Sequence, residues 1–308
     1  RHFTAILGQT GWSIEGMTLT NGHATLTSST DDRGGCLLVE FGSQGALSNC
    51  IISNCVAEDD GGAIQIDDAA SAMIVTNTVF TGCTAVADDG GVIRNEGGDD
   101  NTDLVTTFRN CVFTGNSSGG DGAVAYCSSS DGTILSFINC LMTSNTSAAS
   151  SVINGRDQIT IQNCTIANNT VATGDIIRDQ TDADDAGQVS PQINLSFVRF
   201  QNNIVANNTV TSADPLTSTV FGWNQPGVVR ELGITIGSNI FFNNTAAGGL
   251  SGDGQVPPLA QIGSNGNVNA DPLFVSASDF HLSSAASPAV DTGVTIAGIS
   301  NDLDGAAR

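Results

Sequence analysis

The sequence predicts an all-β protein built as one elongated solenoid, and three observations support this fold class. A degenerate segment recurs along most of the chain, and its residues alternate between apolar and polar. The chain also has 36 glycines and no run of Leu, Glu, Lys and Ala at helical spacing. Because the repeat runs through most of the sequence, we expect a single domain over residues 1–308.

The clearest copy of the repeat is Ile159–Thr170, ITIQNCTIANNT, which we align on Asn163. Apolar residues lie two positions before and three positions after each aligned residue. The aligned positions are 24 to 39 residues apart and are Gly16, Asn49, Asn77, Asn110, Asn139, Asn163, Asn202 and Ser238. This spacing predicts regular coils over residues 1–246, a loop over 247–266, and a closing coil with a C-terminal segment over 267–308. We expect roughly nine or ten coils in total.

The aligned position interrupts the alternation of the strands. Ile161 and Cys164 must both point inward, so the chain has to bend at Asn163. Asparagine suits such a bend because it tolerates the left-handed conformation and its amide can bond the backbone or a stacked asparagine. The sequence therefore predicts a structural ladder formed by Asn49, Asn77, Asn110, Asn139, Asn163 and Asn202.

Charge excludes several classes of partner. Lysine is missing, and the formal net charge is −22, which argues against nucleic acid or an anionic membrane as a partner. No stretch of 18 apolar residues occurs, so we expect no direct membrane span. The acidic surface fits a protein exposed to high salt or to calcium. Since the sequence opens at Arg1 without Met, we expect a mature form or an excised piece.

Two ordered motifs resemble a known family. GGAI at Gly61–Ile64 and FTGN at Phe113–Asn116 are similar to the GGAI and FxxN repeats of polymorphic outer membrane proteins. That resemblance covers residues 34–245 and implies a right-handed parallel β-helix of the pectate-lyase-like kind, displayed on a cell surface. Because no outer-membrane barrel follows, autotransport is not expected.

The end of the chain resembles a second group. Asp271–Phe274 and Ser287–Ala289 are similar to the closing segment of bacterial secreted β-helix proteins with a choice-of-anchor domain. In that group the final Asp-Gly-x-x-Arg motif usually continues into a further strand and an anchor, so the resemblance implies truncation or processing at Arg308.

Cysteine positions suggest one bridge and one stack. Cys55 and Cys83 fall at the same turn position of adjacent coils, within disulfide range, and an extracellular setting permits this bridge. Cys111, Cys140 and Cys164 are expected to form an inward stack of buried residues whose redox state stays open. No Cys/His spacing suggests zinc.

Acidic pairs precede three glycine turns. Asp31-Asp32, Asp59-Asp60 and Asp88-Asp89 are expected at one corner of consecutive coils. Stacked carboxylates repel one another, so either solvent and salt screen them or a hard cation such as Ca²⁺ bridges them through oxygen ligands. These six aspartates are the predicted calcium ligands, and Ca²⁺ is the one cofactor considered.

Enzymatic function is an alternative, because many right-handed β-helices are polysaccharide lyases or glycoside hydrolases. The arginines available to a lyase, Arg94, Arg109, Arg178 and Arg199, do not fall at one corner of neighbouring coils. Asp184-Asp185 lies in an insert without the flanking Asn-x-Asp and Arg-x-Lys patterns of polygalacturonases. The negative chain would also repel a polyuronate, so no catalytic residue is assigned.

Five asparagines match the N-glycosylation pattern but also fall on the turn ladder of the repeat, so both interpretations stay open. They are Asn116, Asn145, Asn168, Asn207 and Asn243. We therefore expect an extracellular or cell-surface solenoid with a structural or adhesive role. Its expected partners are copies of itself, end to end or side by side, and surface glycans, since the sequence shows no cap on the first coil.

Overall fold

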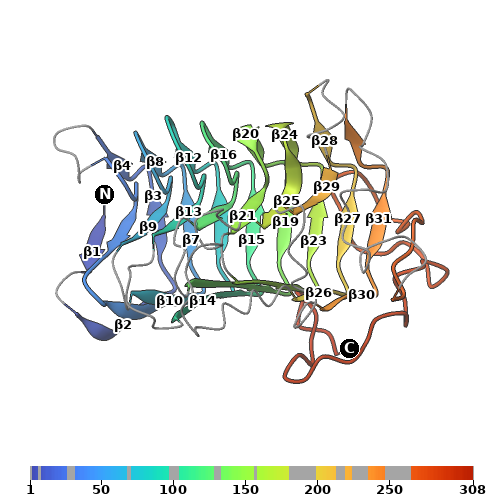
Figure 1. The fold of residues 1–308 in the computed structure, drawn as a ribbon. Coiled ribbons are helices and arrows are strands. Elements are labelled where there is room, and N and C mark those ends of the chain that lie inside the picture. Colours follow the sequence, from blue (N-terminus) through green and yellow to red (C-terminus); the bar gives the residue numbers. More distant parts are fainter. Residues whose placement is uncertain are drawn as a thin grey trace, which may run out of the picture.

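The computed structural model describes residues 2–5, 8–25, 32–67, 71–96, 104–127, 133–155, 158–179, 199–212, 219–223, 235–246 and 265–307. Their regular elements are strands, stacked along one axis from the N-terminal to the C-terminal side (Figure 1). None of the described residues belongs to a helix long and apolar enough to cross a membrane.

The strands form four parallel sheets, which we name A to D. Sheet A comprises β1 (Phe3–Ala5), β5 (Leu37–Val39), β9 (Ile64–Asp67), β13 (Ile93–Glu96), β17 (Ala125–Cys127), β21 (Ile153–Gly155), β25 (Asp175–Asp179) and β29 (Thr219–Trp223). Sheet B comprises β2 (Thr10–Glu15), β6 (Gln44–Ser48), β10 (Ala72–Thr76), β14 (Leu104–Arg109), β18 (Thr133–Ile138), β22 (Gln158–Gln162), β26 (Arg199–Gln201) and β30 (Thr235–Gly237).

The other two sheets have shorter strands. Sheet C comprises β3 (Thr18–Thr20), β7 (Ile51–Ser53), β11 (Val79–Thr81), β15 (Val112–Thr114), β19 (Leu141–Thr143), β23 (Thr165–Ala167), β27 (Ile204–Ala206) and β31 (Ile240–Phe242). Sheet D comprises β4 (His23–Ala24), β8 (Val56–Ala57), β12 (Thr84–Ala85), β16 (Ser117–Ser118), β20 (Thr146–Ser150), β24 (Thr170–Thr173), β28 (Thr209–Val210) and β32 (Thr245–Ala246).

The chain passes through sheets B, C, D and A in turn, and each circuit stacks on the one before it. This arrangement confirms the predicted parallel β-helix. Each sheet has eight strands, so the described residues form eight coils, fewer than the nine or ten expected. The difference arises after β31, where Val268 makes a single parallel bridge to Ile240. Residues 271–307 then leave the stack instead of forming a closing coil.

Inward side chains of successive coils lie on top of one another and fill the interior. Phe80 stacks on Phe113 with ring centroids 5.2 Å apart, and Phe108 stacks on Phe137 at 5.1 Å. All four rings are fully buried. Because each sheet presents the same inward position in every coil, aromatic residues at that position pack with offset faces, which is a favourable arrangement.

The corner between sheets B and C is made by the aligned asparagines. Five of the six have φ between 53° and 58°, and Asn77 has a φ of 49°. Each therefore turns the chain in the left-handed conformation that an asparagine tolerates. Asn77 Nδ2 donates to Asn49 Oδ1, and Asn110 Nδ2 donates to Asn77 Oδ1, both at 3.2 Å. Asn202 Nδ2 donates to Asn163 Oδ1 at 2.9 Å.

A second asparagine ladder lies at the corner between sheets C and D and is buried. It comprises Asn116, Asn145, Asn169, Asn208 and Asn244. Each Nδ2 donates to the Oδ1 of the next asparagine at 2.9 Å, except that of Asn244, which bonds the Val205 carbonyl. The backbone N–H of each of the first four donates to that same Oδ1. The ladder therefore satisfies buried polar groups along five consecutive coils.

The five glycosylation candidates separate into two kinds. Asn116 and Asn145 are fully buried members of this ladder, so in the folded protein their amides are inaccessible. Asn168, Asn207 and Asn243 lie one residue earlier in the turn, with positive φ and at least part of the side chain in solvent.

The structure corrects the predicted disulfide. Cys55 is bonded to Cys36, with the two Cα atoms 5.6 Å apart, and Cys83 is a buried free thiol. Cys36 lies just before β5, the sheet A strand that pairs with β9. Sequence spacing identified the position shared by Cys55 and Cys83, but it carried no signal that Cys36, just before a sheet A strand, lies beside Cys55. Cys111, Cys140 and Cys164 are buried thiols, as expected.

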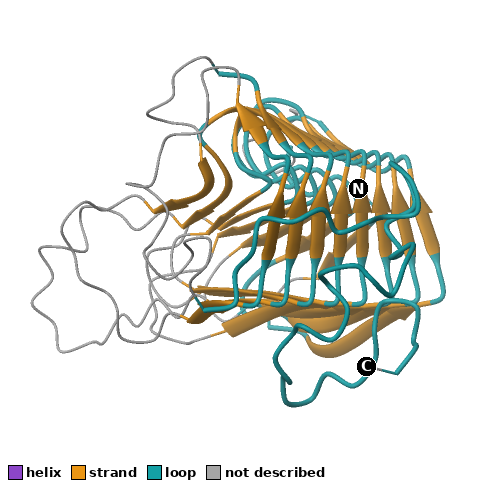
Figure 2. Ribbon diagram, turned by 90° about the vertical axis from the view of Figure 1, so that its right-hand side faces the viewer, coloured by secondary structure: helices purple, strands orange, loops and turns teal. Residues whose placement is uncertain are grey.

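Residues 271–307 run back along the outside of the B–C corner (Figure 2). Asn202 forms two bonds with Val294, since its Nδ2 donates to the carbonyl at 2.8 Å and its Oδ1 accepts from the N–H at 2.9 Å. Asn139 Nδ2 donates to the Asn301 carbonyl at 2.6 Å. The asparagine ladder thus serves both as a corner and as the docking line of the C-terminal segment.

Candidate functional site

The corner between sheets D and A carries the acidic residues. Here Gly61 has a φ of 61°, and a Cβ on Gly62 would overlap the carbonyl oxygen of Gly91 in the next coil. Both glycines are therefore required by the backbone, the first for its left-handed conformation and the second for the close approach of the coils. This explains the GGAI motif in physical terms.

The strand register corrects the alignment of the acidic pairs. Leu37 pairs with Ile64 and Ile64 with Ile93, so Asp32, Asp59 and Asp88 occupy one column of the corner. Counted the same way, Arg33 is equivalent to Asp60 and Asp89. The first pair is thus offset by one residue from the other two. Asp31, also a predicted calcium ligand, lies outside the described residues.

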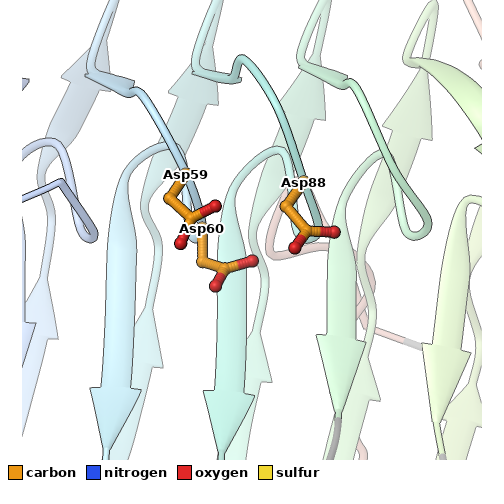
Figure 3. A group of neighbouring side chains, drawn as sticks. All are labelled: Asp59, Asp60 and Asp88. Atoms are coloured by element: carbon orange, nitrogen blue, oxygen red, sulfur yellow. The ribbon is translucent and has the colours of Figure 1, made fainter. Parts of the chain in front are cut away.

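Three of the six predicted calcium ligands come together. Asp59, Asp60 and Asp88 each offer a carboxylate oxygen, and these atoms lie within 4.8 Å of one another (Figure 3). Asp60 is buried, Asp59 is partly buried and Asp88 is exposed. We call these three residues the acidic group.

Asp60 also begins a ladder of its own. Its Oδ1 accepts from the backbone N–H of Asp89 at 3.1 Å, and Asp89 Oδ1 accepts from that of Asp121 at 2.7 Å. Asp121 Oδ1 in turn accepts from the N–H of Ser150 at 2.9 Å. Asp89 therefore bonds the backbone of the next coil and does not belong to the acidic group.

Two arginines in or beside sheet A bind Asp60 and two further carboxylates. Arg94 forms an ion pair with Asp60 and contacts Glu96 at 3.4 Å. Arg33 lies 3.0 Å from both Asp67 and Glu96. The guanidinium of Arg94 also lies 5.7 Å from the centre of the Tyr126 ring. These five charged side chains, Arg33, Asp60, Asp67, Arg94 and Glu96, form what we call the sheet A network.

Burial shifts the protonation of several of these carboxyl groups. Desolvation raises the pKa of Asp67 to about 6, although the bond from Gln65 and the charge of Arg33 oppose the shift. Desolvation also raises the pKa of Asp89 to about 7. The pKa of Asp59 is raised by desolvation first and then by the negative charges of Asp32 and Asp88. Perturbed carboxyl groups beside arginines are the usual mark of a functional or strongly coupled site.

A second polar site lies beneath the C-terminal segment. A pocket of about 550 Å³ is lined by Asn77, Arg109 and Asn110 of the B–C corner and by residues 298–305. Nearby, the ring nitrogens of His281 lie 2.5 Å from Asp279 and 2.8 Å from Asp304. These bonds raise the pKa of His281, the bond to Asp279 most, and the same contact lowers the pKa of Asp279. The bonds tie two parts of the segment together.

Of the arginines considered for catalysis, Arg94 and Arg178 share one column of sheet A, three coils apart, with Tyr126 and Asn154 between them. Arg109 and Arg199 lie in sheet B. Asp184-Asp185 falls outside the described residues. Sequence reasoning missed Arg33 and Glu96, although the equivalence of Arg33 to Asp60 in the glycine motif was a usable signal for the first.

The N-terminal half of the chain matches a family model. The model of the right handed beta helix region matches residues 5–166, about half of the chain. No curated protein and no solved structure gives a significant match. The matched residues include the first five coils, with the acidic corner, the disulfide and the start of the buried asparagine ladder. The chain therefore belongs to the family of proteins with a right-handed β-helix region.

Proposed function

We propose that the protein is an extracellular β-solenoid with a structural or adhesive role at a cell surface. The observation that carries the proposal is the Cys36–Cys55 disulfide, because such bonds persist in oxidising compartments and are rare in reducing ones. The net charge of −22 supports the same setting, where high salt or divalent cations screen surface repulsion.

The structural part of the proposal is supported by how the polar side chains are used. The asparagine side chains of the C–D corner hydrogen-bond one another from Asn116 to Asn244. Their amide groups are therefore used within the stack and do not point toward a ligand. Such a ladder stiffens the stack, since each rung closes the contact between two coils.

The adhesive part is supported by the motifs. GGAI at Gly61–Ile64 and FTGN at Phe113–Asn116 resemble repeats of polymorphic outer membrane proteins, and the final segment resembles secreted proteins with a choice-of-anchor domain. We propose surface glycans as the ligands and the polar pocket beneath the C-terminal segment as a place where they bind.

Self-association is supported by the N-terminal coil. Within the described residues, strands β1 to β4 each pair on one side only, and Phe3 and Met17 are 39% and 45% exposed there. Edges of this kind template pairing with a further chain. We propose that copies associate through this coil, whereas the opposite edge of sheet C is partly occupied by Val268.

Two measurements test the proposal. Fractionation of source cells should place the protein outside the cytoplasm with its disulfide intact. Sedimentation of the purified protein should detect a dimer or larger assembly, and the Phe3→Arg variant should be monomeric. A reduced cytoplasmic protein would overturn the extracellular role, and a monomer at all concentrations would overturn self-association alone.

A carbohydrate-active function is the second candidate, and the sheet A network favours it. Glu96 has 40% of its side chain exposed beside two arginines, and Asp67 has a pKa near neutrality, as a general acid requires. Depolymerisation of a panel of neutral and acidic glycans tests this function. Activity that is lost in Glu96→Gln would establish it, and no release of reducing ends or unsaturated products would exclude it.

A further inference from the structure

Three carboxylates of the acidic group come from two adjacent coils. Asp59 and Asp60 precede the glycine turn of one coil, and Asp88 precedes that of the next. Their ligand atoms lie within 4.8 Å of one another. Three like charges at this separation repel strongly unless a positive charge lies between or beside them.

The arginines of the sheet A network offset only part of this charge. Arg94 pairs with Asp60 and also with Glu96, while Arg33 pairs with Asp67 and Glu96. No ion pair from either arginine to Asp59 or Asp88 is found within the described part of the chain. Two carboxylates of the acidic group therefore have no direct cationic partner there.

A fourth carboxylate provides an independent observation. Asp32 occupies the same column one coil earlier, and its backbone carbonyl accepts from the N–H of Asp59 at 3.2 Å. Asp32 is only 4% exposed, yet its Oδ1 has no hydrogen-bond partner among the described residues. A buried carboxylate oxygen without a donor carries a substantial desolvation cost.

The ligand set distinguishes between the common divalent cations. Calcium binds oxygen at about 2.3–2.6 Å, so two of its ligands can be up to roughly 5 Å apart. Magnesium binds at about 2.0–2.1 Å and demands near-ideal octahedral geometry. Asp59 and Asp88 provide up to four carboxylate oxygens, Asp60 shares its carboxylate with Arg94 and the Asp89 N–H, and the exposed side of Asp88 leaves room for water ligands. The corner therefore suits calcium, which accepts six to eight oxygen ligands in irregular geometry.

We propose that the D–A corner binds one calcium ion through Asp59, Asp60 and Asp88, with the buried carboxylate of Asp32 as a further oxygen ligand or charge partner. Together with Asp32, the ion joins three successive coils at the D–A corner. It acts as a cross-link of the stack, beyond the extracellular role proposed above. Extracellular modules bind calcium with dissociation constants of about 0.1–1 mM, which is the range expected here.

The test is a calcium titration of chelator-treated full-length protein, followed by calorimetry and by the melting temperature. We expect about one ion per chain and a rise of several degrees in Tm at 10 mM calcium, with a much smaller effect of magnesium. The double variant Asp59→Asn, Asp88→Asn should lose at least tenfold in affinity. Its Tm without calcium should equal or exceed that of the unmodified protein, because the repulsion is reduced.

The matched control is Asp271→Asn, Asp291→Asn, which removes the same two charges from exposed positions of the C-terminal segment. It should bind calcium like the unmodified protein. Asp32→Asn provides a further variant and should also weaken binding. A Tm that does not respond to calcium, or an equal response in the acidic-corner variant and the control, would overturn the proposal. Neither result bears on whether the protein is extracellular.

Discussion

Asn145 Nδ2 donates to Asn169 Oδ1 at 2.9 Å, and both side chains are buried between two coils. The Oδ1 of Asn145 meanwhile accepts two bonds from Asn116. One asparagine thus satisfies polar groups in the coil before it and in the coil after it. The C–D ladder therefore satisfies buried polar groups in each of the coils that it joins.

Replacement of a central rung should be costly. Asn145→Ala leaves the buried backbone N–H of Asn116 without its partner and removes one bond each from Asn116 Nδ2, the Phe113 carbonyl and Asn169 Oδ1. A buried unsatisfied group costs about 1–3 kcal/mol. We expect a loss of at least about 3 kcal/mol, measured by denaturant unfolding. Asn244→Ala, at the partly exposed end of the ladder, should cost markedly less. Equal losses at both positions would show that the ladder is not cooperative.

The B–C corner should tolerate glycine but not valine. Asn77 has a φ of 49°, which glycine adopts freely and which costs a β-branched residue about 1–3 kcal/mol. Asn77→Gly should lower Tm slightly and Asn77→Val strongly. The control is Thr76→Val, one residue earlier in strand β10, where valine suits the extended backbone. A tolerated Asn77→Val would contradict the assigned corner conformation.

Asn202 of the B–C ladder bonds the C-terminal segment at Val294. Asn202→Gly keeps the backbone conformation but removes both bonds to Val294. We expect several-fold faster proteolytic cleavage within residues 271–307, followed by mass spectrometry, with little change in global Tm. Asn77→Gly serves as the control, because Asn77 makes its bond within the ladder. If both variants are cleaved at the same rate, Asn202 does not hold the segment.

Disulfide mapping without reduction distinguishes the two pairings. The structure predicts a peptide linking Cys36 to Cys55, retained in Cys83→Ser and lost in Cys36→Ser. The loop closed by this bond has a sequence separation of 19, for which chain-entropy models give about 3 kcal/mol. Reduction should therefore lower Tm by several degrees. A peptide linking Cys55 to Cys83 would restore the pairing inferred from sequence.

The raised pKa of Asp67, about 6 against a usual 3.8, gives a pH dependence. Between pH of about 4 and 6 the unfolded chain has released a proton that the folded chain still binds, so stability falls as pH rises through this window. The total change is up to about 3 kcal/mol. Asp67→Asn should flatten this part of the Tm profile in the presence of chelator, and the exposed Asp291→Asn should not. An unchanged slope would contradict a buried, protonated Asp67.

The sequence predicted the coil architecture because its signal is local and repeated. Asn163 and its equivalents mark a bend in each coil, and the flanking apolar residues mark the inward face. The sequence did not predict the features that depend on which residues of neighbouring strands and sheets lie side by side. A shift of one residue places Arg33, not Asp32, opposite Asp60, and only the folded corner brings Cys36 beside Cys55.

The most direct test of the central claim is immunogold electron microscopy of the source cells with an antibody against the β-helix. The extracellular structural role predicts label at the outer face of the cell or on extended material beyond it. Label confined to the cytoplasm would contradict the account.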